Sequence, residues 1–174
     1  MNIKKTVLVG ALGLMTASGI QADSSLSDRL TIAPTGSGYH PSEMSLDLFG
    51  FYGSHNRGGG NEDAFGPGVG VNYFFTRNVG ISLDSYADAF KVPYLLNASA
   101  IYRYPVGETG LAPYALAGFG RQWRYAAQWT GHIGGGLEYR LNSNTGIFSD
   151  FRRVFADVSK DYTVVRFGFR FSFR

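Results

Sequence analysis

The last eleven residues of the chain, VVRFGFRFSFR (164–174), alternate between two kinds of side chain. From Val165 to Phe173 every second residue is apolar and mostly aromatic, and the residues between them are Arg166, Gly168, Arg170 and Ser172. Successive side chains of a β-strand point to opposite faces, so this segment is predicted to be a strand with one apolar and one cationic face. A membrane β-barrel provides lipid for the first face and a polar lumen for the second.

The cost of placing arginine in lipid decides which face points outward. An arginine on the lipid face at the bilayer midplane costs roughly 2–4 kcal/mol. Two such residues are hard to accommodate in a protein of marginal stability. We therefore expect Arg166 and Arg170 to point into the lumen and the phenylalanine row to face the acyl chains. The alternative is a soluble aromatic-rich barrel, which would bury the phenylalanines and expose both arginines to water.

Alternating blocks about ten residues long, the length of a tilted membrane strand, recur through the rest of the chain. Together they predict an all-β fold, an eight-stranded antiparallel up-and-down transmembrane β-barrel. An even number of strands leaves the first strand's start and the last strand's end on the same side of the membrane. The eight predicted strands are Glu43–Ser54, Ala64–Phe75, Val79–Phe90, Pro93–Tyr104, Leu111–Trp123, Gln128–Leu141, Thr145–Ala156 and Tyr162–Phe173.

The segments between these blocks form two sets. Residues 76–78, 105–110 and 142–144 are tight-turn sequences, which we place in the periplasm. Residues 55–63, 124–128, 157–161 and the region around Lys91 would face outside. Aromatic residues gather at both sets of strand ends, as they do at the two interfaces of a membrane. The predicted belts are Tyr73, Phe75, Tyr102, Tyr104, Tyr139 and Phe173 on one side, and Tyr52, Phe90, Trp123, Trp129, Phe155 and Tyr162 on the other.

The N-terminus has the pattern of a cleavable signal peptide over residues 1–22. Lys4 and Lys5 precede a short apolar run, Thr6–Met15, and a small residue, Ala22, stands at the expected cleavage point. That run is too short to cross a bilayer as a helix. Residues 23–42 are rich in Ser, Gly and Pro and are predicted to be a flexible leader, so that residues 43–174 form the barrel domain.

Charge and cysteine content exclude several classes of function. Without Lys4 and Lys5 the chain keeps 14 basic and 13 acidic residues, and these are interleaved along the sequence. This balance gives no basis for nucleic-acid binding. The absence of cysteine excludes disulfides, Cys-ligated metals and a lipid-modified N-terminal cysteine.

Strand parity predicts a set of charged side chains in the lumen. Acidic and basic members are nearly equal in number, and an unpaired buried charge is costly, so we expect ion pairs across the strands. A closed, salt-bridged plug is favoured over an ion-lined pore, because eight strands enclose just enough space for side chains. The predicted lumen residues are Asp47, Asp84, Arg103, Glu138, Arg140, Asp150, Arg152, Arg166 and Arg170.

No catalytic residue, cofactor site or metal site is predicted. His132 and Glu138 share the lumen face, but six residues of strand separate them by ~20 Å. A catalytic serine for His132 would have to come from another strand. The glycine-rich segment around residues 57–63 lacks the Lys-Ser/Thr of a phosphate-binding loop.

With the segments APYALAGFG (112–120), DFRRVF (150–155) and the closing aromatic strand, the chain resembles the outer-membrane protein A/X-like family of small eight-stranded barrels. The resemblance implies a location in the outer membrane, contact with its lipid and no cofactor. It also implies that Phe173 is part of the signal read by the barrel-assembly machinery, although Arg174 follows it. We expect a monomer.

Members of that family serve in envelope integrity, adhesion or host contact, and a few modify lipids. We therefore expect a non-enzymatic outer-membrane protein that serves envelope structure or surface interaction. A narrow channel for ions or small solutes and a lipid A-modifying enzyme are the two alternatives.

Overall fold

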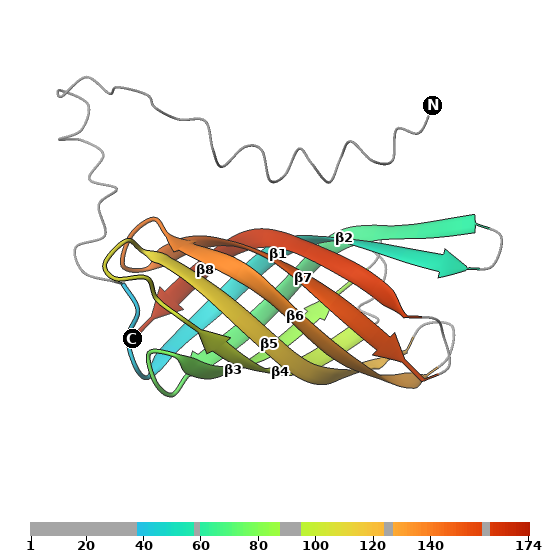
Figure 1. Cartoon of the computed structure of the whole chain (residues 1–174), viewed down its shortest axis with the longest axis horizontal. Helices are drawn as coiled ribbons and strands as arrows, with labels where there is room; N and C mark the ends of the chain where they lie inside the picture. The colour runs from blue at the N-terminus through green and yellow to red at the C-terminus, as the bar shows by residue number, and fades with distance from the viewer. Residues whose placement is uncertain (1–37, 58–59, 88–94, 124–126, 158–160) are drawn as a thin grey trace, which may run out of the picture. The chain divides into compact units, whose positions relative to one another are not determined.

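Eight β-strands pair in sequence order and close into a barrel (Figure 1). The computed structural model describes residues 38–57, 60–87, 95–123, 127–157 and 161–174. Every neighbouring pair is antiparallel, and β8 pairs with β1 to complete the cylinder. The predicted fold class is confirmed for the barrel, whereas the predicted signal peptide lies outside the described residues. The strands are β1 (Glu43–Arg57), β2 (Gly60–Phe74), β3 (Val79–Tyr86), β4 (Leu95–Arg103), β5 (Leu111–Gln122), β6 (Gln128–Arg140), β7 (Thr145–Ala156) and β8 (Tyr162–Phe173).

The strand boundaries follow the predicted blocks closely except at one hairpin. β7 and β8 begin and end at the predicted residues, but residues 55–57 and 60–63, predicted to lie in a loop, belong to strands. Instead β1 and β2 continue to pair up to Arg57 and Gly60. The pairing of β1 with β8 stops earlier, at Ser54 and Thr163. Main-chain hydrogen bonding between two adjacent strands therefore overrides the turn-like composition of this segment.

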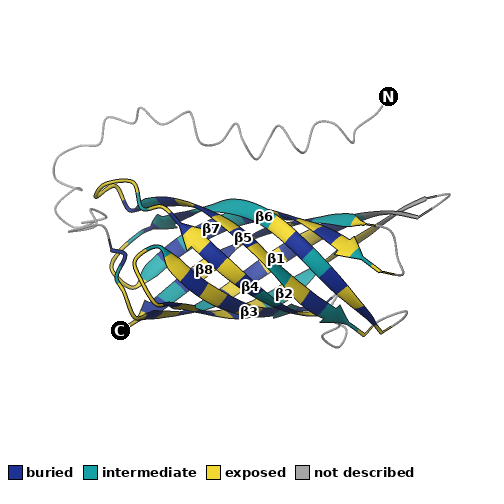
Figure 2. Cartoon of the chain, turned by 60° about the horizontal axis from the view of Figure 1, so that its bottom comes forward, coloured by how far each residue is buried: buried dark blue, intermediate teal, exposed yellow. Residues whose placement is uncertain are grey.

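The wall of the barrel is apolar outside and charged inside, as the closing strand predicts. In β8, Phe167 and Phe169 are 58% and 49% exposed, whereas Arg166 and Arg170 are only 3% and 2% exposed. Buried and exposed residues alternate in the same way along the other strands (Figure 2). An apolar surface that continues around the outside of the barrel is unfavourable in water and suits the acyl chains of a bilayer. In the described ranges no helix is long and apolar enough to cross a membrane.

Exposed aromatic residues mark the two ends of the barrel. We call the end where β1 begins and β8 ends the proximal end, and the opposite end the distal end. Exposed aromatic residues stand at both, among them Tyr102 and Tyr104 at the proximal end and Trp123 and Trp129 at the distal end. The prediction that Tyr162 belongs to the distal belt is wrong, because this residue is half-buried and packs against apolar residues of the interior. The predicted belt residue Phe90 lies outside the described residues.

The lumen contains apolar side chains as well as charges. In the first predicted strand Phe49 and Phe51 share the parity of Asp47, which suggests either a bulge or aromatic residues packed in the interior. Both rings are buried beside the charged residues, so they are packed interior aromatics. They belong to a cluster in the distal part of the lumen that also contains Tyr86, Leu95, Phe148, Val154 and Val164. Charged residues thus occupy the middle and the proximal part of the lumen, and an apolar layer lies on their distal side.

Candidate functional site

All nine residues predicted to face the lumen are buried in the interior, each no more than 3% exposed. A tenth charged residue, Glu43, lies with them and is also buried. The set therefore contains five carboxylates and five guanidinium groups, which balance in charge. Their ion pairs form two layers, one at the proximal end and one in the middle of the barrel.

The proximal layer is built around Arg170 of β8. Its guanidinium group donates two parallel hydrogen bonds of 2.7 Å to the carboxylate of Asp47 on β1. The same group also donates to Glu138 of β6, whose other oxygen accepts from Arg140 at 2.7 Å. The layer thereby connects three strands that lie far apart in the sequence. Bidentate arginine–carboxylate pairs have fixed geometry, so these contacts hold their side chains in one arrangement.

Glu43 completes the proximal layer, although it is not among the lumen residues predicted from the sequence. Its carboxylate accepts from Arg103 at 2.9 Å and from Arg140. The guanidinium group of Arg103 also lies 3.5 Å from the centre of the Phe74 ring. Glu43 shares the parity of Asp47 on the same strand, and this signal was sufficient to place it in the lumen. Its position as the first residue of its block concealed that role.

The middle layer pairs two aspartates with two arginines. Arg166 donates to both oxygens of Asp150, at 2.9 and 2.6 Å, and lies 3.4 Å from Asp84. Arg152 donates to Asp84 at 2.9 Å. The hydroxyl group of Tyr114 donates a further hydrogen bond of 2.8 Å to Asp150. Each carboxylate thus contacts two guanidinium groups, which offsets the cost of burying the charges.

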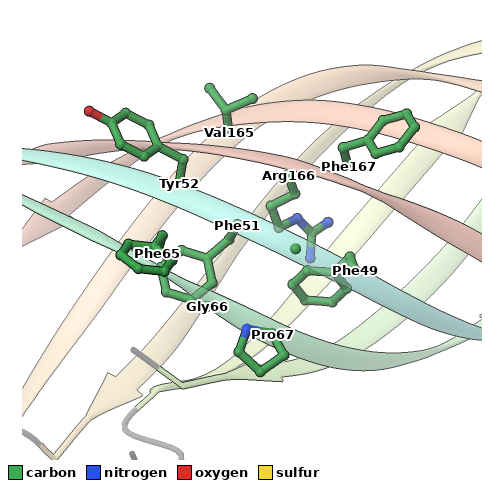
Figure 3. A pocket seen from close by; sticks show the side chains of 10 residues that line it. Phe49, Phe51, Tyr52, Phe65, Gly66, Pro67, Val165, Arg166 and Phe167 are labelled. Atoms are coloured by element: carbon green, nitrogen blue, oxygen red, sulfur yellow. The ribbon is translucent and has the colours of Figure 1, made fainter. Parts of the chain in front are cut away.

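The distal apolar cluster lies directly against this charged layer. The guanidinium carbon of Arg166 is 4.5 Å from the centre of the Phe49 ring, a cation–π contact. Figure 3 shows these two side chains beside each other, with Tyr52, Val165 and Phe167 on the opposite side of the strands. Phe49 has room because Gly168 faces it, and a methyl group there would collide with it. Rings and ion pairs therefore fill successive levels of the lumen.

Residues before β1 cover the proximal mouth of the barrel. Tyr39, which falls in the predicted flexible leader, is 2% exposed and donates a hydrogen bond of 2.8 Å to the carbonyl oxygen of Gly110. Its ring lies within cation–π distance of Arg103 and Arg140, at 4.7 and 4.9 Å. Gly38, with a φ of +64°, provides the left-handed backbone that turns the chain into this position. Residues 23–37 of the predicted leader lie outside the described residues.

Burial changes the pKa of Tyr39. Removal of the phenol from water raises its pKa well above the ordinary value of 10.0, and the nearby Glu138 carboxylate raises it further. The hydroxyl group therefore remains a hydrogen-bond donor at physiological pH.

One polar pair in the lumen has the composition of a partial catalytic site. The hydroxyl oxygen of Ser99 on β4 lies 2.8 Å from Nε2 of His132 on β6. This is the serine from another strand that a His132-based site requires. The other ring nitrogen, Nδ1, has no hydrogen-bond partner among the described residues, so no acidic group orients the imidazole as in a triad. In the same ranges no group of three or more potential metal ligands occurs.

No protein-family model matches the chain, and no curated protein matches it in sequence. Solved structures do match. The chain resembles Neisserial surface protein A with a TM-score of 0.59 and 16% identity, over 75% of this chain and 97% of that one. It resembles the N-terminal β-barrel domain of Pseudomonas aeruginosa OprF with a TM-score of 0.56 and 24% identity, over 77% and 99% of the two chains.

The fold is that of the eight-stranded outer-membrane barrels. A third match is Ail, the attachment invasion locus protein of Yersinia pestis, with a TM-score of 0.57 and 15% identity over 76% of this chain and 99% of that one. At these identities the likeness concerns the fold. It agrees with the resemblance drawn from the closing strand and with an outer-membrane location.

Proposed function

We propose that this protein is a non-enzymatic outer-membrane barrel whose lumen is closed by paired charges, and that it serves envelope structure or surface interaction. The observation that carries the proposal is the complete pairing of the interior carboxylates. Each of Asp84, Glu138 and Asp150 contacts two guanidinium groups. Charges that neutralise one another in this way are unsuited to coordinating a passing ion, which would have to break an existing pair.

The layers above and below the charges support the same function. The distal cluster around Phe49 and Phe148 would separate the ion pairs from the outer surface, and Tyr39 would cover them from the proximal side. We place the proximal end in the periplasm, because the tight-turn sequences at residues 76–78, 105–110 and 142–144 lie at that end. Phe173, at the end of β8, would then present the assembly signal to the barrel-assembly machinery on the periplasmic side. The barrel would function as a monomer in outer-membrane lipid.

Thiol accessibility tests the closed lumen, because the chain has no cysteine of its own. Ser82 points into the lumen and is 6% exposed, whereas Ser143 lies exposed in a proximal turn. We expect Ser143→Cys to react rapidly with a small charged thiosulfonate reagent and Ser82→Cys to remain unreacted in the refolded barrel. Planar-bilayer recordings of the unmodified protein should show no steady conductance.

A narrow channel would give the opposite results. Rapid modification of Ser82→Cys together with steady conductance would contradict the plugged lumen. A change of ion selectivity in Arg166→Gln would then identify the pathway. Altered lipid A in cells that overproduce the protein would instead favour the lipid-modifying enzyme.

A further inference from the structure

Within the described ranges, Arg121 is an outward-facing arginine for which no carboxylate partner occurs. Arg121 has the outward parity of Phe119 near the distal end of β5, and its guanidinium carbon lies 5.2 Å from the centre of the Trp129 ring on β6. It forms no ion pair with any described carboxylate. Arg153, the outward arginine of β7, has such a partner in Asp161 at 3.6 Å. A cation at the edge of a membrane attracts the anionic group of a neighbouring lipid.

A gap in the aromatic wall lies beside this arginine. Gly131 of β6 stands opposite Phe119 of β5 and Phe155 of β7, with Trp129 and Ile133 on either side of it along its own strand. All four neighbours are exposed. A Cβ atom at Gly131 would meet nothing within 4 Å. The wall therefore has a slot, one side chain wide, between four bulky apolar residues.

The arginine and the slot follow one another along the wall in the same sequence as the headgroup and the acyl chain of a lipid. Arg121 pairs with Trp129, whereas the slot lies one outward position nearer the bilayer centre, at the pair of Phe119 and Gly131. A phosphate bound by Arg121 at the distal interface would thus let an acyl chain run inward through the slot. We propose that the β5–β7 wall binds one phosphate-bearing membrane lipid in this way. The inference rests on the proposed orientation of the barrel in a membrane.

A second outward glycine distinguishes this site from an ordinary gap in the wall. Gly50 of β1 is exposed and faces Pro67 on β2 and Phe167 on β8. No outward-facing arginine lies opposite its neighbours Leu48 and Tyr52, whose partners are Val69, Phe65, Phe169 and Val165. Gly50 offers apolar space without a cation, so it is a matched control for Gly131.

The test uses Trp129 as its own reporter. The chain has two tryptophans, so Trp123→Phe leaves Trp129 as the single tryptophan, which can be excited selectively and lies beside both the arginine and the slot. The barrel is refolded into phosphatidylcholine vesicles that contain brominated phosphatidylglycerol or, at equal mole fraction, brominated phosphatidylcholine. We expect phosphatidylglycerol to quench Trp129 with an apparent binding constant about fivefold higher, the effect of one arginine near an anionic headgroup.

Four further variants in the same background locate the effect. Arg121→Gln should reduce the ratio of the two binding constants to about one. Gly131→Leu should weaken quenching by both lipids, because it fills the slot. Arg77→Gln, which removes an exposed cation at the proximal end, and Gly50→Leu should change neither quantity. The ratio between lipids is insensitive to the direct effect of Arg121 on the fluorescence of Trp129.

Three outcomes would overturn the inference. These are equal quenching by the two lipids in the parent protein, a preference that survives Arg121→Gln, and weak quenching by both lipids because a second copy of the chain covers the wall. Heat-modifiable gel mobility of each sample separates this failure from that of the proposed function. A sample that shows the mobility shift but no lipid preference contradicts only the lipid site, whereas absence of the shift contradicts the membrane barrel.

Discussion

Arg170 and Asp47 are direct partners across the seam that closes the barrel. They are 123 residues apart in the sequence, yet the arginine donates hydrogen bonds from Nε and one terminal nitrogen to the two carboxylate oxygens, both at 2.7 Å. The pair forms only when β8 lies against β1. Its formation is therefore coupled to closure of the cylinder, and its loss should be felt in the stability of the whole barrel.

Replacing Arg170 with Met should destabilise the barrel strongly. The substitution leaves Asp47 buried without its bidentate partner, and breaking one side of a buried ion pair costs ~3–5 kcal/mol. Urea unfolding in lipid vesicles, followed by tryptophan fluorescence, measures the change in free energy of unfolding. In the double variant Asp47→Asn/Arg170→Met the loss should be smaller than the sum of the two single losses.

Arg153→Met is the matched control for this prediction. It removes the same charge from a pair with Asp161 whose side chains are 48% and 41% exposed, so the expected loss is below ~1 kcal/mol. Equal losses of unfolding free energy in Arg153→Met and Arg170→Met would show that the buried pair contributes no more to stability than the exposed one.

Gly168→Ala should also destabilise the barrel, for a steric reason. A Cβ atom at Gly168 would lie 2.2 Å from the carbonyl oxygen of Leu48 and 2.6 Å from the Cβ of Phe49. Relief of that overlap requires a shift of backbone or ring, with an expected cost of ~1–3 kcal/mol. Gly131→Ala, with nothing within 4 Å, should stay within ~0.5 kcal/mol of the parent in the same unfolding assay. A tolerated Gly168→Ala would contradict the packing of Phe49.

Tyr39 should titrate later than an ordinary tyrosine. Its pKa is raised above 10.0 by burial, so its contribution to stability is complete below pH 10 and is lost as the pH rises through the higher pKa of the folded state. The tyrosinate cannot donate to Gly110, so the residue should then leave the mouth. The difference in ultraviolet absorbance between the parent and Tyr39→Phe follows this single phenol during alkaline titration. A midpoint at the ordinary value would show that Tyr39 is not docked.

Ser99→Ala should affect stability and leave lipid chemistry unchanged. The variant loses the hydrogen bond with Nε2 of His132, an expected cost of about 1 kcal/mol in urea unfolding. Lipid A from cells that overproduce the parent or the variant should be identical by mass spectrometry. A modification made by the parent and absent with Ser99→Ala would assign a catalytic role to the pair.

The closing strand illustrates how much of the fold local sequence determines. The alternation of phenylalanine with Arg166 and Arg170 predicts strand, parity and orientation, because each depends on a period of two and on the cost of a charge in lipid. Strand five shows where this reasoning stops. Because alanine and glycine are frequent on both faces of β5, the two faces differ little in polarity. Only the pairing with neighbouring strands places Tyr114 inside and Phe119 outside.

The sequence by itself determined the class of fold, the number of strands and which charges avoid lipid, since these follow from periodicity and solvation along single strands. Only the tertiary structure decided the partners of those charges, the apolar layer around Phe49 and the cover formed by Tyr39. Such contacts depend on strand register and on the inward reach of side chains from opposite walls. Both are set when the cylinder closes, and no local pattern encodes them.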